Sequence, residues 1–185
     1  MKKYLVVALL AGLILTLFAV NKTNKQDNIA AFLENLNIQY SSNEALIKYL
    51  EYDNKTDDSL QAQIYPDKLI LSDQKTEVET SLKDSQFYLS FAPFINETHP
   101  CTFHVPTGCQ GEMPNQQFFV TIRNLKTNEL IYNDLVTTAD NGFAGLWLPR
   151  NIEASIEVMA SGLSSKQTIS TYNDDPTCLT TLNLI

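Results

Sequence analysis

The pattern of apolar and polar residues changes twice along this 185-residue chain. An unbroken apolar run of 17 residues, Tyr4 to Val20, follows Met1-Lys2-Lys3 and gives way abruptly to polar residues. Between Asp27 and Leu50 the apolar residues recur at helical spacing, which predicts two short helices with a core-facing stripe. Beyond about residue 60, apolar residues alternate with polar ones or form short runs, which predicts strands.

The predicted strands are separated by Pro, Asp and Ser and by turn pairs such as Asn141-Gly142. Many short strands joined by turns favour an antiparallel sandwich or barrel. The order of segments between Phe119 and Ile169 also resembles the transthyretin-like or carboxypeptidase-regulatory-like sandwich, a resemblance that implies a fold and no function. We expect Met159 in the core of this sandwich. The strands are expected at Ala62–Tyr65, Lys68–Leu71, Gln86–Phe91, Phe118–Ile122, Leu130–Val136, Gly145–Leu148, Ala154–Ala160 and Lys166–Thr171.

These patterns predict a mainly β protein, in which an antiparallel β-sandwich-like C-terminal domain follows a short helical N-terminal region. We assign residues 1–25 to a signal peptide or N-terminal membrane anchor and residues 26–58 to the helical region with its linker. Residues 59–185 are expected to form the β-rich domain. The segment Glu51–Ser59 (EYDNKTDDS) is polar and is interpreted as the linker.

The N-terminal segment has the order of a signal peptide, in which a charged start precedes an apolar stretch. Ala19 could end a cleavage site, but Leu17 is bulkier than the small residue that such a site prefers. The apolar run is also close to the roughly 20 residues that a spanning helix needs. A cleaved signal peptide and an uncleaved anchor that contacts the membrane therefore both remain open. Either one is expected to place the residues beyond about 25 outside the cytosol.

The formal net charge is −8 and the sequence pI is near 4.7. Contacts to nucleic-acid phosphates need clustered Lys and Arg, so nucleic acid is excluded as an expected partner. The charged residues form no block of one sign, which favours a role in solubility.

Soft and borderline metal ligands are concentrated in one short segment. Both histidines and two of the three cysteines fall within 11 residues, from His99 through Cys101 and His104 to Cys109, and Cys178 is the third cysteine. Thiolates and imidazoles are ligands for copper and zinc, so the segment predicts a metal or redox site. An odd number of cysteines leaves at least one thiol unpaired within the chain. A disulfide between Cys101 and Cys109, with a buried free Cys178, is the alternative.

The local sequence predicts how these side chains could converge. Pro100, Pro106 and Gly108 disfavour regular structure, so a loop or hairpin tip is expected, and a reversal at Pro106–Gly108 would bring Cys109 back towards Cys101. The Cys-x7-Cys spacing lacks the short chelates of structural zinc sites. Three thiolates, or two thiolates and an imidazole, match the low coordination number and the softness of Cu(I) better.

The words His99-Pro-Cys-Thr-Phe-His104 and Pro106-Thr-Gly-Cys109-Gln-Gly-Glu-Met, with Cys178 some seventy residues later, resemble the CueP family of periplasmic or cell-surface copper-binding proteins. The resemblance implies that Cys101, Cys109 and Cys178 bind copper and are redox-active. It also matches His99 and His104 to histidines of the motif, which makes them candidate metal ligands.

The same resemblance implies a copper chaperone that sequesters copper, serves copper resistance and homeostasis, and supplies copper to a periplasmic superoxide dismutase. It also implies a location in the periplasm or at the extracytoplasmic face of the inner membrane. The expected metal is Cu(I), and Cu(II) is expected to bind before the thiols reduce it. Envelope thiol reductases are expected partners. We therefore expect a binding protein without catalytic turnover, and a homodimer is left open. The alternatives are a thiol-disulfide redox protein, a disulfide-stabilised interaction domain and a hydrolase that uses Cys109 with His104.

Overall fold

The computed structural model describes residues 28–53, 60–83 and 86–185. The predicted signal peptide or anchor, residues 1–25, lies outside the described residues. Among the helices that are described, none is long and apolar enough to cross a membrane.

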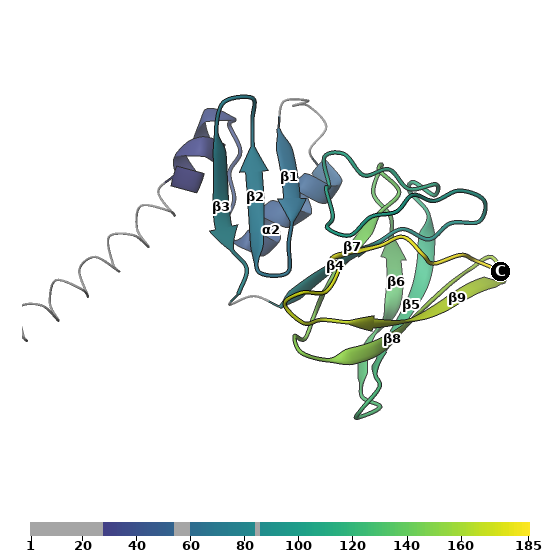
Figure 1. Cartoon of the computed structure of the whole chain (residues 1–185). Coiled ribbons are helices and arrows are strands. Elements are labelled where there is room, and N and C mark those ends of the chain that lie inside the picture. The colour runs from purple at the N-terminus through teal and green to yellow at the C-terminus, as the bar shows by residue number, and fades with distance from the viewer. Residues whose placement is uncertain (1–27, 54–59, 84–85) are drawn as a thin grey trace, which may run out of the picture.

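The N-terminal part forms a helix–sheet layer, in which helices cover one face of a three-stranded sheet (Figure 1). The helical elements are a helix over residues 28–35, α2 (Asn43–Lys48) and a π-helical turn, η1 (Tyr49–Asp53), and they confirm the predicted helical region. The antiparallel sheet has the order β1-β2-β3, with β1 at Gln61–Ile64, β2 at Lys68–Ser72 and β3 at Glu77–Ser81.

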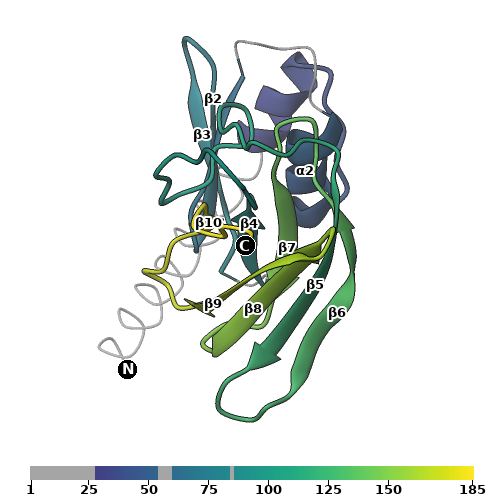
Figure 2. The same ribbon diagram turned by 90° about the vertical axis from the view of Figure 1, so that its right-hand side faces the viewer.

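The rest of the chain forms a two-sheet sandwich, as the strand pattern predicts. One sheet has the order β10-β4-β7, with β4 at Phe87–Phe91, β7 at Ala144–Leu148 and β10 at Cys178–Leu179. The other has the order β6-β5-β8-β9, with β5 at Gln117–Asn124, β6 at Leu130–Thr137, β8 at Glu153–Ala160 and β9 at Leu163–Ser170. Figure 2 shows the strands of this second sheet side by side, in the order β6-β5-β8-β9.

β4 lies between the two larger of the three hydrophobic clusters of the described residues. Phe87, Leu89 and Phe91 pack into the sandwich core with the buried residues of β5 and β8. Tyr88 points the other way and packs with the helix–sheet layer, since successive side chains of a strand face opposite sides. Every residue of β4 is buried as a result. The core of the helix–sheet layer combines residues from both sides of residue 59. The boundary predicted there, between the helical region with its linker and the β-rich domain, stays a prediction.

The structure corrects four details of the sequence prediction. β3 was not predicted, because Val78 is its single large apolar residue, and neither was the two-residue β10. β10 pairs with β4 in parallel, so the sandwich is not purely antiparallel. Met159 is 39 % exposed because it faces outwards on β8. Glu51 belongs to η1 and is buried, so it is not part of a linker.

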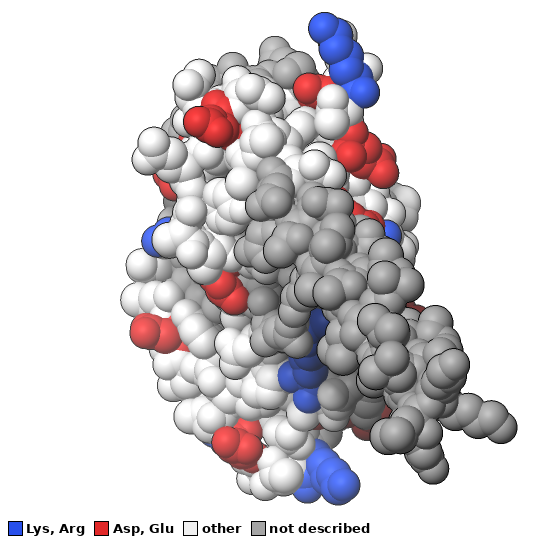
Figure 3. All heavy atoms as spheres, turned by 90° about the vertical axis from the view of Figure 1, so that its left-hand side faces the viewer, with Lys and Arg blue, Asp and Glu red and all other residues white. Residues whose placement is uncertain are grey.

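Charged side chains are dispersed over the face that Figure 3 presents, where acidic and basic residues alternate with uncharged ones. No basic patch appears among the described residues on this face, in agreement with the acidic composition. The candidate chemistry lies elsewhere, in the loop of residues 92–116 that joins β4 to β5 and runs past β10.

Candidate metal centre

The loop between β4 and β5 reverses direction where Pro106 and Gly108 predicted a reversal. The backbone N–H groups of Gly108 and Cys109 both donate to the carbonyl of Val105, at 2.9 and 2.7 Å. This turn brings the Cys109 Sγ to 3.6 Å from the Cys101 Sγ. The reversal that the local sequence predicts is therefore present, and it brings the two cysteines of the loop together.

Cys178 reaches the loop from the C-terminal end of the chain. It begins β10, where it pairs with Ser90 of β4, and its backbone N–H donates to the carbonyl of Thr102 at 3.2 Å. Cys178 forms a disulfide with Cys101, and Cys109 is the free, buried thiol. The alternative prediction of a Cys101–Cys109 disulfide is wrong for this structure, because the parallel β10–β4 pairing places Cys178 against Cys101.

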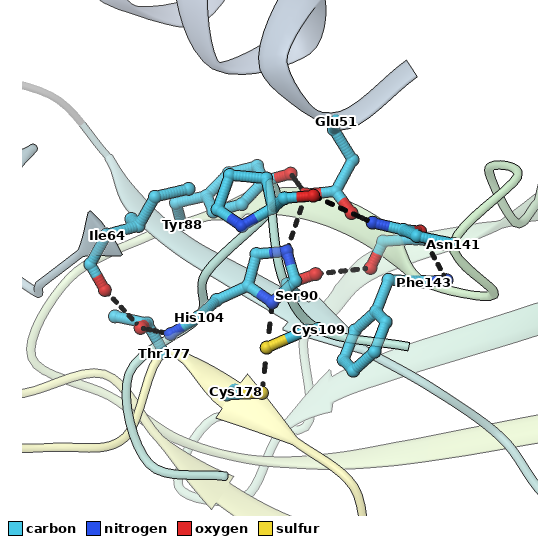
Figure 4. Close-up of polar contacts among 12 residues, drawn as sticks. Glu51, Ile64, Tyr88, Ser90, His104, Cys109, Asn141, Phe143, Thr177 and Cys178 are labelled. Atoms are coloured by element: carbon cyan, nitrogen blue, oxygen red, sulfur yellow. Dashed lines mark hydrogen bonds and ion pairs between the residues drawn. The ribbon is translucent and has the colours of Figure 1, made fainter. Parts of the chain in front are cut away.

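His104 is held between the helix–sheet layer and the sulfurs (Figure 4). Its backbone forms an isolated antiparallel bridge with Ile64, and its N–H donates to Thr177 Oγ1 at 3.0 Å. The ring stacks obliquely on Phe143, with 4.7 Å between ring centroids. Its Nδ1 lies 3.8 Å from the Cys178 Sγ, and its Nε2 lies 2.8 Å from Glu51 Oε2. The side chains of His104 and Glu51 are both completely buried.

The Glu51 carboxylate collects three donors in this buried position. Besides His104, Tyr88 donates its hydroxyl to Oε2 at 3.1 Å and Asn141 donates its amide to Oε1 at 3.2 Å. Burial lowers the pKa of His104, but the charge of Glu51 and a hydrogen bond with Cys109 outweigh it and raise this pKa to about 9. Burial, followed by the charge of Glu51, raises the pKa of Tyr88 well above its usual value.

All five predicted ligand residues fall into two overlapping groups. The outer group is His99, Cys101 and Cys109, and the inner group is His104, Cys109 and Cys178. Within each group, one ligand atom from each residue lies within 4.8 Å of the others. The inner group is entirely buried, whereas His99 and Cys101 are partly exposed. Cys109 belongs to both groups, so the two groups form one continuous path from the surface inwards.

Five residues of this arrangement were not identified as site residues from the sequence: Glu51, Tyr88, Asn141, Phe143 and Thr177. Glu51 was assigned to a linker, although it follows Ile47 by four positions and so continues the buried helical face. A carboxylate on such a face is a signal that could have identified it. Thr177 and Asn141 carry no comparable signal, since their roles depend on contacts with residues far away in the chain.

Comparisons with known proteins show what this chain is similar to. The model of the family described as "Periplasmic copper-binding protein CueP" matches residues 45–183. Among solved structures, the crystal structure of S.CueP matches with a TM-score of 0.78 and 36 % sequence identity, over 84 % of this chain and 97 % of that chain. No match was found among the curated proteins.

Proposed function

The chain belongs to the CueP family of periplasmic copper-binding proteins, and from this premise we propose that its reduced form sequesters Cu(I). The proposed ligands of the buried ion are Cys109, Cys178 and His104. Cys101 and His99 form the partly exposed entrance, where copper first meets a thiolate and an imidazole. Soft thiolates at low coordination number favour Cu(I) over harder divalent ions.

The observation that carries this proposal is the sharing of Cys109 between the outer and inner groups. An ion bound at the entrance can exchange Cys101 and His99 for Cys178 and His104 while it remains bonded to Cys109. Such stepwise exchange keeps the ion coordinated throughout. A protein that sequesters Cu(I) needs continuous coordination of the ion, because free Cu(I) would otherwise be released. A chaperone that passes copper to a periplasmic superoxide dismutase needs it for the same reason.

The disulfide connects copper binding to the redox state of the chain. In the oxidised form, Cys101 and Cys178 are bonded to each other and only Cys109 offers a thiol. We propose that the reduced thiols also reduce Cu(II): two Cu(II) ions each accept one electron, and the two thiolates of Cys101 and Cys178 join as the disulfide. An envelope thiol reductase would then return the two thiols and complete the cycle.

A second candidate function is thiol-disulfide exchange without copper. It is favoured by the Cys109 Sγ, which lies 3.6 Å from the Cys101 sulfur of the disulfide. Attack of the Cys109 thiolate on Cys101 would form a Cys101–Cys109 disulfide and release Cys178 as a thiolate, so that atoms and electrons balance within the chain.

An anaerobic Cu(I) titration against a competing chelator tests the proposal. The reduced chain should bind tightly, Cys109→Ser should lose the most affinity because it removes the shared ligand, and the oxidised chain should bind weakly. Cys101→Ser and Cys178→Ser are the matched variants, each of which removes a ligand from one group. Equal binding by wild type and all three variants, or no tight binding by wild type, would refute copper sequestration by these residues.

A further inference from the structure

Glu51 is a fully buried carboxylate that the helix–sheet layer contributes to a site built mainly by the loop and β10. Burying an ionised carboxylate is costly unless its oxygens accept hydrogen bonds. Here both oxygens do, from His104 and Tyr88 on Oε2 and from Asn141 on Oε1. The arrangement in Figure 4 is therefore a satisfied polar network with a defined orientation for each partner.

The contact with Glu51 settles how the two nitrogens of His104 are used. An ionised carboxylate can only accept, so the Nε2 that lies 2.8 Å away must carry a proton, whether the ring is neutral or charged. The other nitrogen, Nδ1, points to the sulfur side, where the Cys178 Sγ lies 3.8 Å away. The ring is further restrained by its contact with Phe143. The backbone of His104 is held separately, because its N–H donates to Thr177 Oγ1.

We infer that Glu51 is the positioning residue of the copper site: its contact with Nε2–H makes Nδ1 the nitrogen of His104 that binds the ion. This inference rests on the copper site proposed above. Metal-binding histidines commonly donate their second N–H to a carboxylate, which fixes the ring and increases its strength as a ligand. Glu51 does not touch the ion in this arrangement and acts through His104.

The position of Glu51 gives the helix–sheet layer a role in the chemistry. Glu51 lies 53 positions before His104 and follows Leu50, which is part of the layer's own core. Two further contacts join the layer to the loop: the Ile64 N–H donates to the His104 carbonyl at 2.8 Å and the Ala62 N–H donates to Thr107 Oγ1 at 3.0 Å. The sandwich with its loop therefore supplies the ligands, and the layer supplies the group that orients one of them.

The first test observes wild type, and a variant serves only to assign its signals. The full reduced chain, labelled with 15N, is loaded with Cu(I) under anaerobic conditions, and the imidazole nitrogens are observed by long-range 1H–15N NMR. His99→Gln identifies the signals of His104, the other histidine of the chain. A protonated Nε2 with a copper-bound Nδ1 is the expected result. Copper bound to Nε2, or no copper on His104, would overturn the inference.

The second test compares Glu51→Gln with Glu157→Gln in the chelator competition. Glu157 lies on β8 and pairs with Lys166, so its variant removes the same charge away from the site. Loss of the group that orients a metal-binding histidine typically weakens metal affinity about 10- to 100-fold, and this loss is expected for Glu51→Gln alone. Unchanged affinity in Glu51→Gln, while wild type binds, would overturn the role of Glu51 and leave the copper site standing. No binding by wild type would overturn both.

Discussion

Cys101 and Cys178 are joined by a disulfide although 77 positions separate them in the chain. The pairing follows from the sandwich, because β10 runs parallel to β4 and the backbone N–H groups of Thr177 and Cys178 donate to the carbonyl of Thr102 in the loop. The third cysteine, Cys109, lies next to this bond and also in contact range of His104. The proposed storage of copper and the proposed exchange of disulfides would therefore use the same three sulfurs.

The thiol count of the oxidised chain follows directly from this pairing. After denaturation without a reductant, alkylation should label one thiol per chain, Cys109, and after reduction it should label three. In the native state Cys109 should react slowly, since only 8 % of the residue is exposed. Mass spectrometry of the labelled peptides checks both points. A peptide that links Cys101 to Cys109 in the resting chain would contradict the pairing.

Replacing Thr177 by valine should destabilise the contact between β10, the loop and β1. The buried Thr177 hydroxyl donates to the Ile64 carbonyl at 2.6 Å and accepts from the backbone N–H of His104 at 3.0 Å. Each buried polar group left without a partner costs about 1 to 3 kcal/mol. Urea denaturation should detect this loss. Thr168→Val, at an exposed threonine of β9, is the control and should change the free energy of unfolding by about 0.5 kcal/mol or less.

Gly142→Ala should be far more costly than Gly162→Ala, although both glycines have a left-handed backbone, with φ of 78° and 83°. The backbone conformation alone costs an alanine roughly 1 to 2 kcal/mol. A Cβ on Gly142 would also lie 2.6 Å from the Gly111 carbonyl oxygen, whereas one on Gly162 would meet nothing within 4 Å. We expect a loss of about 3 kcal/mol or more for Gly142→Ala, since overpacking adds to the strain. Equal midpoints of thermal unfolding for the two variants would contradict this.

Glu112 should stabilise the loop in a pH-dependent way. Its carboxylate accepts from the backbone N–H groups of Ile95 and Asn96, at 2.5 and 3.0 Å, and these bonds lower its pKa from 4.5 to about 2. A lowered pKa means that the stabilisation is present above pH 4.5 and is lost as the pH falls towards 2. Glu112→Gln should therefore unfold at a lower temperature than wild type at pH 7, with a difference that shrinks below pH 4.5. A difference that does not vary with pH would refute the charge-dependent role.

The strands that could be predicted are those with a clear local pattern. β5 and β8 alternate buried and exposed residues along their length, and this alternation is visible in the sequence. β3 and β10 carry no such pattern, because β3 is polar and β10 has only two residues. Their pairing is decided by neighbouring strands, which a local pattern does not contain.

The sequence by itself determined which ligands this protein offers, since five cysteines and histidines in a recognisable motif identify a copper-binding family. It also determined the reversal that brings Cys109 to Cys101, because proline and glycine restrict the backbone locally. Only the tertiary structure decided which cysteines are bonded and which group orients His104. Both depend on residues more than 50 positions apart, and their approach is set by the packing of β10 on β4 and of η1 on the loop. Such long-range contacts result from the burial of whole faces, so no short stretch of sequence specifies them.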